Sequence, residues 1–305
     1  MAGGAPSQPI FSGGSVWMYS PVLALAIIGA VLFGLATIYL SYLTLIRYRT
    51  RYFICAVLSG IIETVGFVLR CWSIQNQSQL PPFITSLSLL VLAPLLLAAS
   101  VYLLVGRLIQ AVLPASHHLR FLGGLHARHT TAVFVGLDIL AAVVQSAGTV
   151  VAASANWHGP RALTGVDILV AGLALQTAAF VAFVVVLARF AYVTRKKDDG
   201  HGGVHAVVRH NAPPGWQRLV VAEAVSAVLI LIRCIYRLVE FAGGVTGYAF
   251  RTEWLFWVFD GFAMLVATGV FCIWHPGAYL GRDGGKAVAS GDETEVSLDS
   301  AERRK

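Results

Sequence analysis

Residues 83–106 read FITSLSLLVLAPLLLAASVYLLVG, a stretch without a charged side chain. An α-helix needs about 20 consecutive, mostly apolar residues to cross the hydrocarbon core of a bilayer, and this stretch is long enough. Six further stretches of similar character occur in the chain, so the sequence predicts an all-α bundle of seven transmembrane helices. The predicted spans are residues 21–45, 52–70, 83–106, 131–153, 164–190, 219–241 and 254–274.

The composition supports a membrane protein. Hydrophobic residues make up 57% of the chain and charged residues 12%, and the mean hydropathy is +0.74. A soluble globular domain carries about 25% charged residues. The net charge of +7 could indicate a nucleic-acid partner, but the basic residues lie at the ends of the apolar stretches and not in a polar domain. We therefore expect the bilayer, and no nucleic acid, as the environment of this chain.

The distribution of Lys and Arg predicts the orientation of the bundle. Of the 22 basic residues, seventeen lie in the connections and the tail on one side of the predicted spans, and three lie on the other side. Segments rich in Lys and Arg stay in the cytoplasm. We therefore expect an extracellular N-terminal segment at residues 1–20, a membrane domain at 21–277 and a cytoplasmic tail at 278–305. The tail is rich in Gly, Ser and charge, which is typical of disordered chain.

Several charged residues lie inside the predicted spans, although a charge at the bilayer centre costs about 2.5–3.5 kcal/mol on insertion scales. Helical spacing places them on shared faces. Glu63, Gly66 and Arg70 form one stripe of the second span. The stripe of the sixth span consists of Arg233, Tyr236, Arg237, Glu240 and Gly243. Glu253 and Asp260 share a face of the seventh span.

These stripes meet in the middle or outer part of the bundle if the second, sixth and seventh spans are neighbours. One interpretation is an ion-pair network that fixes helix register and binds nothing. The other is a polar cavity, open toward the outer leaflet, that receives the head group of an amphipathic lipid. In that case a carboxylate such as Glu63 or Asp260 pairs with an ammonium group, and the hydrocarbon tail stays among apolar helix faces.

Further polar residues lie in the fourth and fifth spans, and a proline lies in the third. Asp138, Gln145 and Gln176 are expected to hydrogen-bond between helices, which is worth about 0.6–2 kcal/mol for each bond. Asp138 is also a candidate for the translocation site. Pro94 has no backbone N–H, so we expect it to free a carbonyl group and to kink the third span.

Motifs in six of the spans resemble those of one family. The second span matches E-x-x-G-[YF]-x-x-R from Glu63, and the sixth matches R-x-x-[YF]-R-x-x-E-x-x-G from Arg233. The third contains L-A-P from Leu92, and the seventh closes with H-P-G from His275. Over residues 25–280 the chain resembles the fungal lipid-translocating exporter family, also called the RTA-like or aminocholesterol-resistance family.

The resemblance implies a protein that moves, or confers resistance to, amphipathic molecules such as sphingoid long-chain bases or sterol-like toxicants. It favours the plasma membrane, with the endoplasmic reticulum or vacuole as alternatives. A seven-helix lipid receptor or sensor has the same topology and stays open as the alternative function. An enzyme is disfavoured because no histidine lies within a predicted span to bind a metal or haem. We therefore expect no catalytic residue, no metal and no cofactor.

Overall fold

The computed structural model describes residues 17, 20–112, 127–155, 159–195, 214–244 and 247–281. All regular structure within these residues is helical. The described part contains seven helical segments that are long and apolar enough to cross a membrane, which confirms the predicted all-α bundle. These segments are Leu23–Arg47, Arg51–Gln75, Pro81–Val112, Thr131–Ser154, Gly159–Tyr192, Trp216–Ala242 and Glu253–Leu280.

The spans are built from several helical elements. The first two are α1 (Leu23–Ser41) with a π-helical turn at Tyr42–Arg47, and a 3-10 turn (Arg51–Phe53) leading into α2 (Ile54–Gln75). The next four are α3 (Leu80–Val112), α5 (Ala127–Ser154), α6 (Gly159–Arg195) and α7 (Trp216–Ala242). The remaining elements are α8 (Tyr248–Arg251), α9 (Glu253–Phe256), a π-helical turn (Trp257–Phe262), α10 (Ala263–Ile273) and α11 (Pro276–Leu280).

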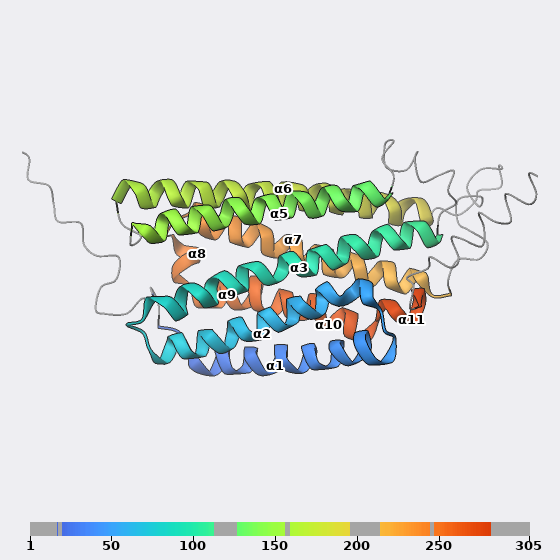
Figure 1. The fold of residues 1–305 in the computed structure, drawn as a ribbon, viewed down its shortest axis with the longest axis horizontal. Coiled ribbons are helices and arrows are strands. Elements are labelled where there is room, and N and C mark those ends of the chain that lie inside the picture. The colour runs from blue at the N-terminus through green and yellow to red at the C-terminus, as the bar shows by residue number, and fades with distance from the viewer. Residues whose placement is uncertain are drawn as a thin grey trace, which may run out of the picture.

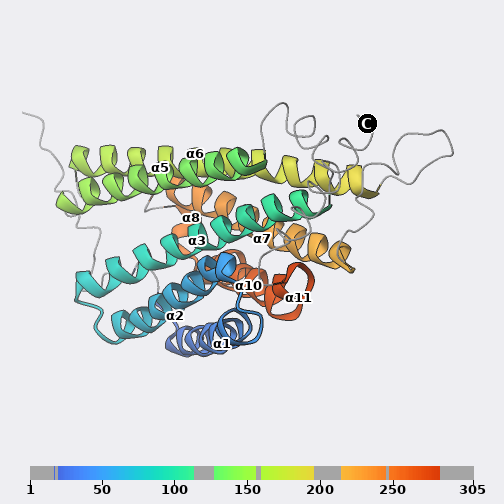
Figure 2. The ribbon, with the colours of Figure 1, turned by 45° about the vertical axis from the view of Figure 1, so that its right-hand side comes forward.

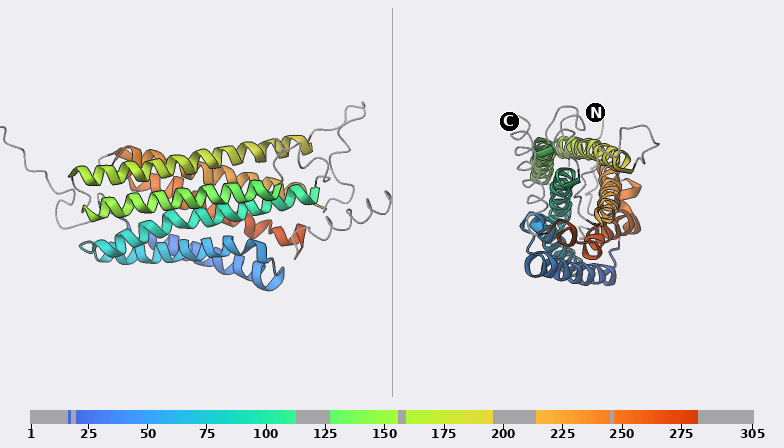
Figure 3. Two further views of the ribbon diagram at one scale, coloured as in Figure 1. Left: turned by 45° about the horizontal axis from the view of Figure 1, so that its top comes forward. Right: turned by 90° about the vertical axis from the view of Figure 1, so that its right-hand side faces the viewer.

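The helices form a closed ring. Each span packs against its neighbours in sequence, and α10 closes the ring by packing against α1. Helices α1 and α2 lie on one side of the bundle, α5 and α6 lie on the other, and α3 and α7 lie between them (Figures 1 and 2). The end-on view in Figure 3 shows this order, and α3 also contacts α7 across the ring. Side chains of α3 and α7 therefore reach the interior of the bundle.

The two ends of the bundle differ in charge. The end at which the first span gives way to the second, and at which α11 lies, carries Arg47, Arg49 and Arg51, and we call it the basic end. The opposite end carries the turn between α2 and α3 and the short helix α8 (Figure 1). The predicted segment 1–20 falls outside the described residues except for Trp17 and Ser20, and residues 282–305 of the predicted tail also lie outside them.

The fifth and seventh spans differ from simple membrane-spanning helices. Helix α6 has 37 residues and, at 1.5 Å per residue, is about 55 Å long, so it extends well beyond a hydrocarbon core of about 30 Å. In the seventh span the backbone widens into a π-helical turn at Trp257–Phe262, and Asp260 lies within it. Such turns are frequent at functional sites. Helical structure also continues past residue 277, because α11 ends at Leu280.

The H-P-G motif holds α11 against the end of the first span and the turn that follows it. The ring of His275 accepts a hydrogen bond from the backbone N–H of Gly277 through Nδ1 (3.1 Å), and Nε2 contacts the Thr44 hydroxyl at 3.0 Å. A Cβ atom at position 277 would lie 2.5 Å from the Cβ of Tyr48. The glycine therefore permits a close approach that a larger residue would block.

Candidate functional site

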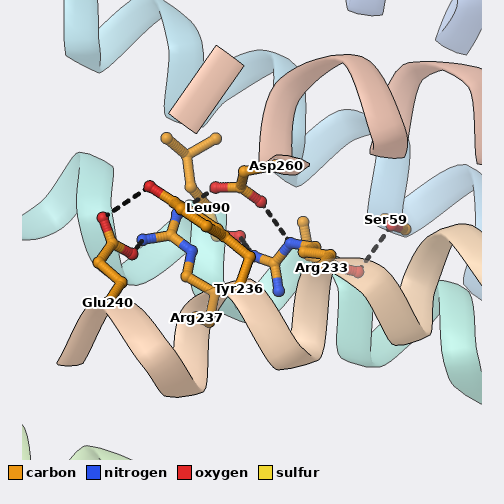
Figure 4. A network of polar contacts seen from close by, with 8 residues as sticks. Ser59, Leu90, Arg233, Tyr236, Arg237, Glu240 and Asp260 are labelled. Carbon is orange, nitrogen blue, oxygen red and sulfur yellow. Dashed lines mark hydrogen bonds and ion pairs between the residues drawn. The ribbon is translucent and has the colours of Figure 1, made fainter. Parts of the chain in front are cut away.

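Two arginines of α7 share one carboxylate of the seventh span (Figure 4). Arg233 donates from Nε to Oδ1 of Asp260 at 2.5 Å, and Arg237 donates from Nη2 to Oδ2 of the same group. The three residues are at most 2% exposed. Positions 233 and 237 face Asp260 together because residues four apart lie on one face of a helix. The predicted convergence of the sixth and seventh spans is thus present in the structure.

Glu240 and Tyr236 extend these contacts along α7. Arg237 donates from Nη1 to Oε2 of Glu240 at 2.9 Å, and the Tyr236 hydroxyl donates to Oε1 at 3.1 Å. The Tyr236 ring stacks on Phe259 with 5.9 Å between centroids. Each oxygen of the Glu240 carboxylate therefore has a partner on the same helix.

Arg233 also binds a backbone carbonyl of α3. Its Nη2 donates to the Leu90 oxygen at 2.5 Å. In a regular α-helix this oxygen would accept from the N–H of residue 94, and Pro94 has no N–H. The proline therefore leaves the Leu90 carbonyl without its usual donor, and the guanidinium of Arg233 supplies one.

Glu63 of α2 lies beside these ion pairs and is 2% exposed. It is close enough to interact electrostatically with Arg233, Arg237 and Asp260, but its Oε2 has no hydrogen-bond partner among the described residues. The same holds for Nε of Arg237. We call Glu63, Arg233, Tyr236, Arg237, Glu240 and Asp260 the central cluster. It contains three carboxylates and two guanidinium groups, so in its fully ionised form it carries one excess negative charge.

Arg70 and Glu253 form a separate pair nearer the opposite end of the bundle. Their charged groups are 3.5 Å apart, and Oε2 of Glu253 also accepts from the backbone N–H of Val22 at 3.0 Å. The Arg70 guanidinium lies 4.2 Å from the ring centroid of Phe256, and the Arg237 guanidinium lies 5.5 Å from the same centroid. The ring of Phe256 thus lies between this pair and the central cluster.

Asp138 is not part of the central cluster. It lies on α5 near the hydroxyl of Tyr102 of α3, although neither carboxylate oxygen makes a hydrogen bond of good geometry within the described residues. Gln145 donates from Nε2 to Oε1 of Gln176 at 2.9 Å, and this bond joins α5 to α6 as expected. These residues lie apart from the cluster because α5 and α6 are on the far side of α3 and α7.

The two glycines of the predicted stripes, Gly66 and Gly243, have different surroundings. A Cβ atom at Gly66 would lie 2.9 Å from Cδ2 of Leu90, so this glycine lets α2 approach α3 closely. Gly243 follows the last residue of α7, and its backbone N–H bonds to the Val239 carbonyl at 3.0 Å. Gly243 therefore ends a helix, and the nearest atoms to its Cβ position belong to its own helix and to Gly247.

Comparison with known proteins identifies the family. Residues 56–283 match the model of the family described as RTA1 like protein. The chain belongs to the RTA1-like family. The matched region runs from α2 through α11 and contains the whole central cluster. The family resemblance predicted from the motifs is confirmed.

Three curated fungal proteins illustrate what the chain is similar to. The chain is 29% identical over 272 residues to the probable lipid transporter atnI of Emericella nidulans, covering 88% of this chain and 69% of the relative. It is 32% identical to Protein RTM1 of Saccharomyces cerevisiae, covering 73% and 65%. It is 27% identical to the sphingoid long-chain base transporter RSB1 of Saccharomyces cerevisiae, covering 83% and 73%. No solved structure gives a significant match.

Two features of this RTA1-like protein were missed in the sequence analysis. Glu223 of α7 is fully buried, and neither of its carboxylate oxygens has a partner among the described residues. Glu223 lies 14 residues before Arg237, so both residues lie on the same face of α7. The helical spacing that identified Arg237 was therefore a signal for Glu223 as well. The second feature is the bond from Arg233 to the Leu90 carbonyl. Pro94 was expected to free a carbonyl group, but the arginine that binds it was not predicted.

Proposed function

We propose that this protein moves single-chain amphipathic amines between the leaflets of a membrane, with sphingoid long-chain bases as the substrate class. The observation that carries the proposal is the unpaired oxygen of Glu63, which belongs to a cluster whose fully ionised form has one excess negative charge. An ammonium group would neutralise that charge and supply the missing donor. The names of the relatives support this choice, since one is called a probable lipid transporter and another a sphingoid long-chain base transporter.

The second unpaired atom of the cluster is consistent with the same ligand class. Nε of Arg237 is a donor without a partner in the described part of the chain, and a hydroxyl oxygen next to the ligand's amine would accept from it. A sphingoid base carries an ammonium group and hydroxyl groups at one end of an alkyl chain. One such head group can therefore satisfy both Glu63 and Arg237.

The ion pairs hold the site in place while the head group passes. A charged head group crossing hydrocarbon loses its hydration, and a preformed opposite charge offsets part of that loss. Asp260 fixes both arginines, so Glu63 is the carboxylate left for the substrate. Because Arg233 and Arg237 have partners before the lipid arrives, binding requires no buried ion pair to break.

The charge distribution supports a proposal for the membrane setting. We propose that the basic end faces the cytoplasm and that the central cluster lies toward the outer leaflet, since Glu240 is near the end of α7 and Asp260 near the start of the last span. The plasma membrane is the proposed location. No chemical step is assigned to the protein, which we propose acts as a transporter and not as an enzyme.

Reconstitution into liposomes tests the proposal. A fluorescent sphingoid base placed in the outer leaflet is expected to lose its accessibility to albumin extraction in the presence of the protein. Glu63→Gln removes the excess charge and is expected to slow this transfer at least tenfold, equivalent to about 1.4 kcal/mol. The matched control is Asp167→Asn, the same change at an exposed position of α6, which should transfer at the wild-type rate.

The substrate's amine provides a second arm of the same experiment. An N-acetylated base has no positive charge and is expected to be a poor substrate of the wild-type protein. Equal rates for wild type and Glu63→Gln would remove Glu63 from the mechanism. Liposomes in which the wild-type protein transfers no sphingoid base at all would overturn the proposed function.

A further inference from the structure

A groove of about 270 Å³ lies between α3, α5 and α6, away from the residues of the central cluster. Its apolar walls include Leu87, Val91 and Leu95 of α3, and Leu169 and Leu173 of α6. These α3 residues are four apart, so they form one continuous stripe along the helix. The groove is therefore elongated along the bundle, as an alkyl chain requires.

The position of the groove determines what can fill it. Every residue that lines it belongs to one of the seven membrane-spanning segments. Neighbouring side chains on α5 that do not line the groove, such as Val143 (61% exposed), point away from the bundle. The surroundings of the groove are thus hydrocarbon, and the available occupant is a lipid chain.

One buried polar side chain that lines the groove has an unpaired hydrogen-bond acceptor. Gln145 lines the groove and is 4% exposed. Its Nε2 is held by Gln176, whereas its Oε1 has no hydrogen-bond partner among the described residues. A buried acceptor without a donor is unfavourable, and hydrocarbon supplies none. A hydroxyl group of a ligand in the groove would supply that donor.

We propose that this groove is a second lipid-binding site, which holds the alkyl chain of an amphipathic lipid while Gln145 Oε1 accepts a hydrogen bond from a hydroxyl group of that lipid. The choice of a hydroxylated long-chain base as the lipid rests on the proposed function. The groove differs from the central cluster because it lacks charge and faces the bilayer. It suits a lipid that has entered from the membrane and has not yet reached the central cluster.

Photo-crosslinking in nanodiscs tests this site in the full-length protein. The probe is an 18-carbon sphingoid base with a diazirine at the middle of its chain. After irradiation, peptide mass spectrometry is expected to find the label on groove residues of α3 and α5. Gln145→Leu is expected to reduce this labelling at least fivefold. A diazirine-bearing octadecylamine without hydroxyl groups should label wild type and Gln145→Leu equally.

Gln176→Leu is the matched control for Gln145→Leu. It removes the same bond between α5 and α6 but leaves the Gln145 oxygen in place, and Gln176 does not line the groove. We expect it to keep at least half of the wild-type labelling. A second pair separates filling of the groove from effects on folding. Ala142→Phe places a ring in the groove and should abolish labelling, whereas Val143→Phe on the outer face should not.

The outcomes distinguish the groove from the proposed function. Labelling outside the groove, or equal labelling of Gln145→Leu and wild type, would overturn the groove site even if liposome transfer succeeds. Labelling in the groove together with no transfer in liposomes would leave the binding site intact and reject the transporter. Loss of labelling in Gln176→Leu to the level of Gln145→Leu would show that the interhelical bond, and not the free oxygen, is responsible.

Discussion

Replacing Asp260 with leucine tests the energetic role of the central cluster. The carboxylate accepts one charge-assisted hydrogen bond from Arg233 and one from Arg237. Each is worth about 1.5–3 kcal/mol, which gives about 3–6 kcal/mol for the two. Breaking a buried ion pair on one side typically costs about 3–5 kcal/mol. We therefore expect Asp260→Leu to lower the free energy of unfolding by about 3–5 kcal/mol, more than a hundredfold in the ratio of folded to unfolded protein.

Arg237→Met in the Asp260→Leu background completes the test. The double variant lacks one of the two arginines that Asp260→Leu leaves without a carboxylate. Its decrease in the free energy of unfolding should therefore be smaller than the sum of the two single decreases by about 1.5–3 kcal/mol. The assay is equilibrium unfolding in mixed micelles with increasing SDS, followed by far-UV circular dichroism. Asp167→Leu, at an exposed position of α6, is the control and should stay within about 0.5 kcal/mol of wild type. Strictly additive losses, or an Asp260→Leu variant as stable as wild type, would refute the reasoning.

Two further predictions concern helix packing and a buried charge. A Cβ atom at Gly165 of α6 would lie 2.4 Å from the backbone nitrogen of Ala152, so Gly165→Leu should lower stability by about 1–3 kcal/mol in the same unfolding assay, whereas Gly136→Leu, where the space is open, should not. Glu223→Leu removes a buried carboxylate whose oxygens have no partner among the described residues. Because such a group costs about 1–3 kcal/mol, this variant should have a higher melting temperature than wild type, and a lower one would contradict the reading of Glu223 as unpaired.

The spans and the central cluster could be predicted because both depend on local periodicity. Long apolar stretches define a membrane helix regardless of its neighbours. The spacing of Arg233, Arg237 and Glu240 places them on one face whatever that face touches. Proximity of the last span then brings Asp260 to them. The family motifs pointed to the same residues.

Other parts of the site depend on which helices are neighbours, and periodicity does not specify that. Asp138 was a candidate for the translocation site, and the ring order places α5 on the far side of α3 from the central cluster. Arg70 and Glu253 were expected to join the other charges, and the ring of Phe256 lies between the two groups. The π-helical turn around Asp260 was not predicted from the sequence either.

The contact between Arg233 and the carbonyl freed by Pro94 limits how the protein can move. A slide of α3 along α7 by even one residue would break this bond and leave the Leu90 carbonyl and one N–H group of Arg233 without a partner in a hydrocarbon medium. Helices α3 and α7 should therefore move together as one rigid unit at the centre of the bundle. Any opening that lets a lipid pass must come from the helices on either side of this unit. Either α1 and α2 or α5 and α6 would then move relative to α3 and α7.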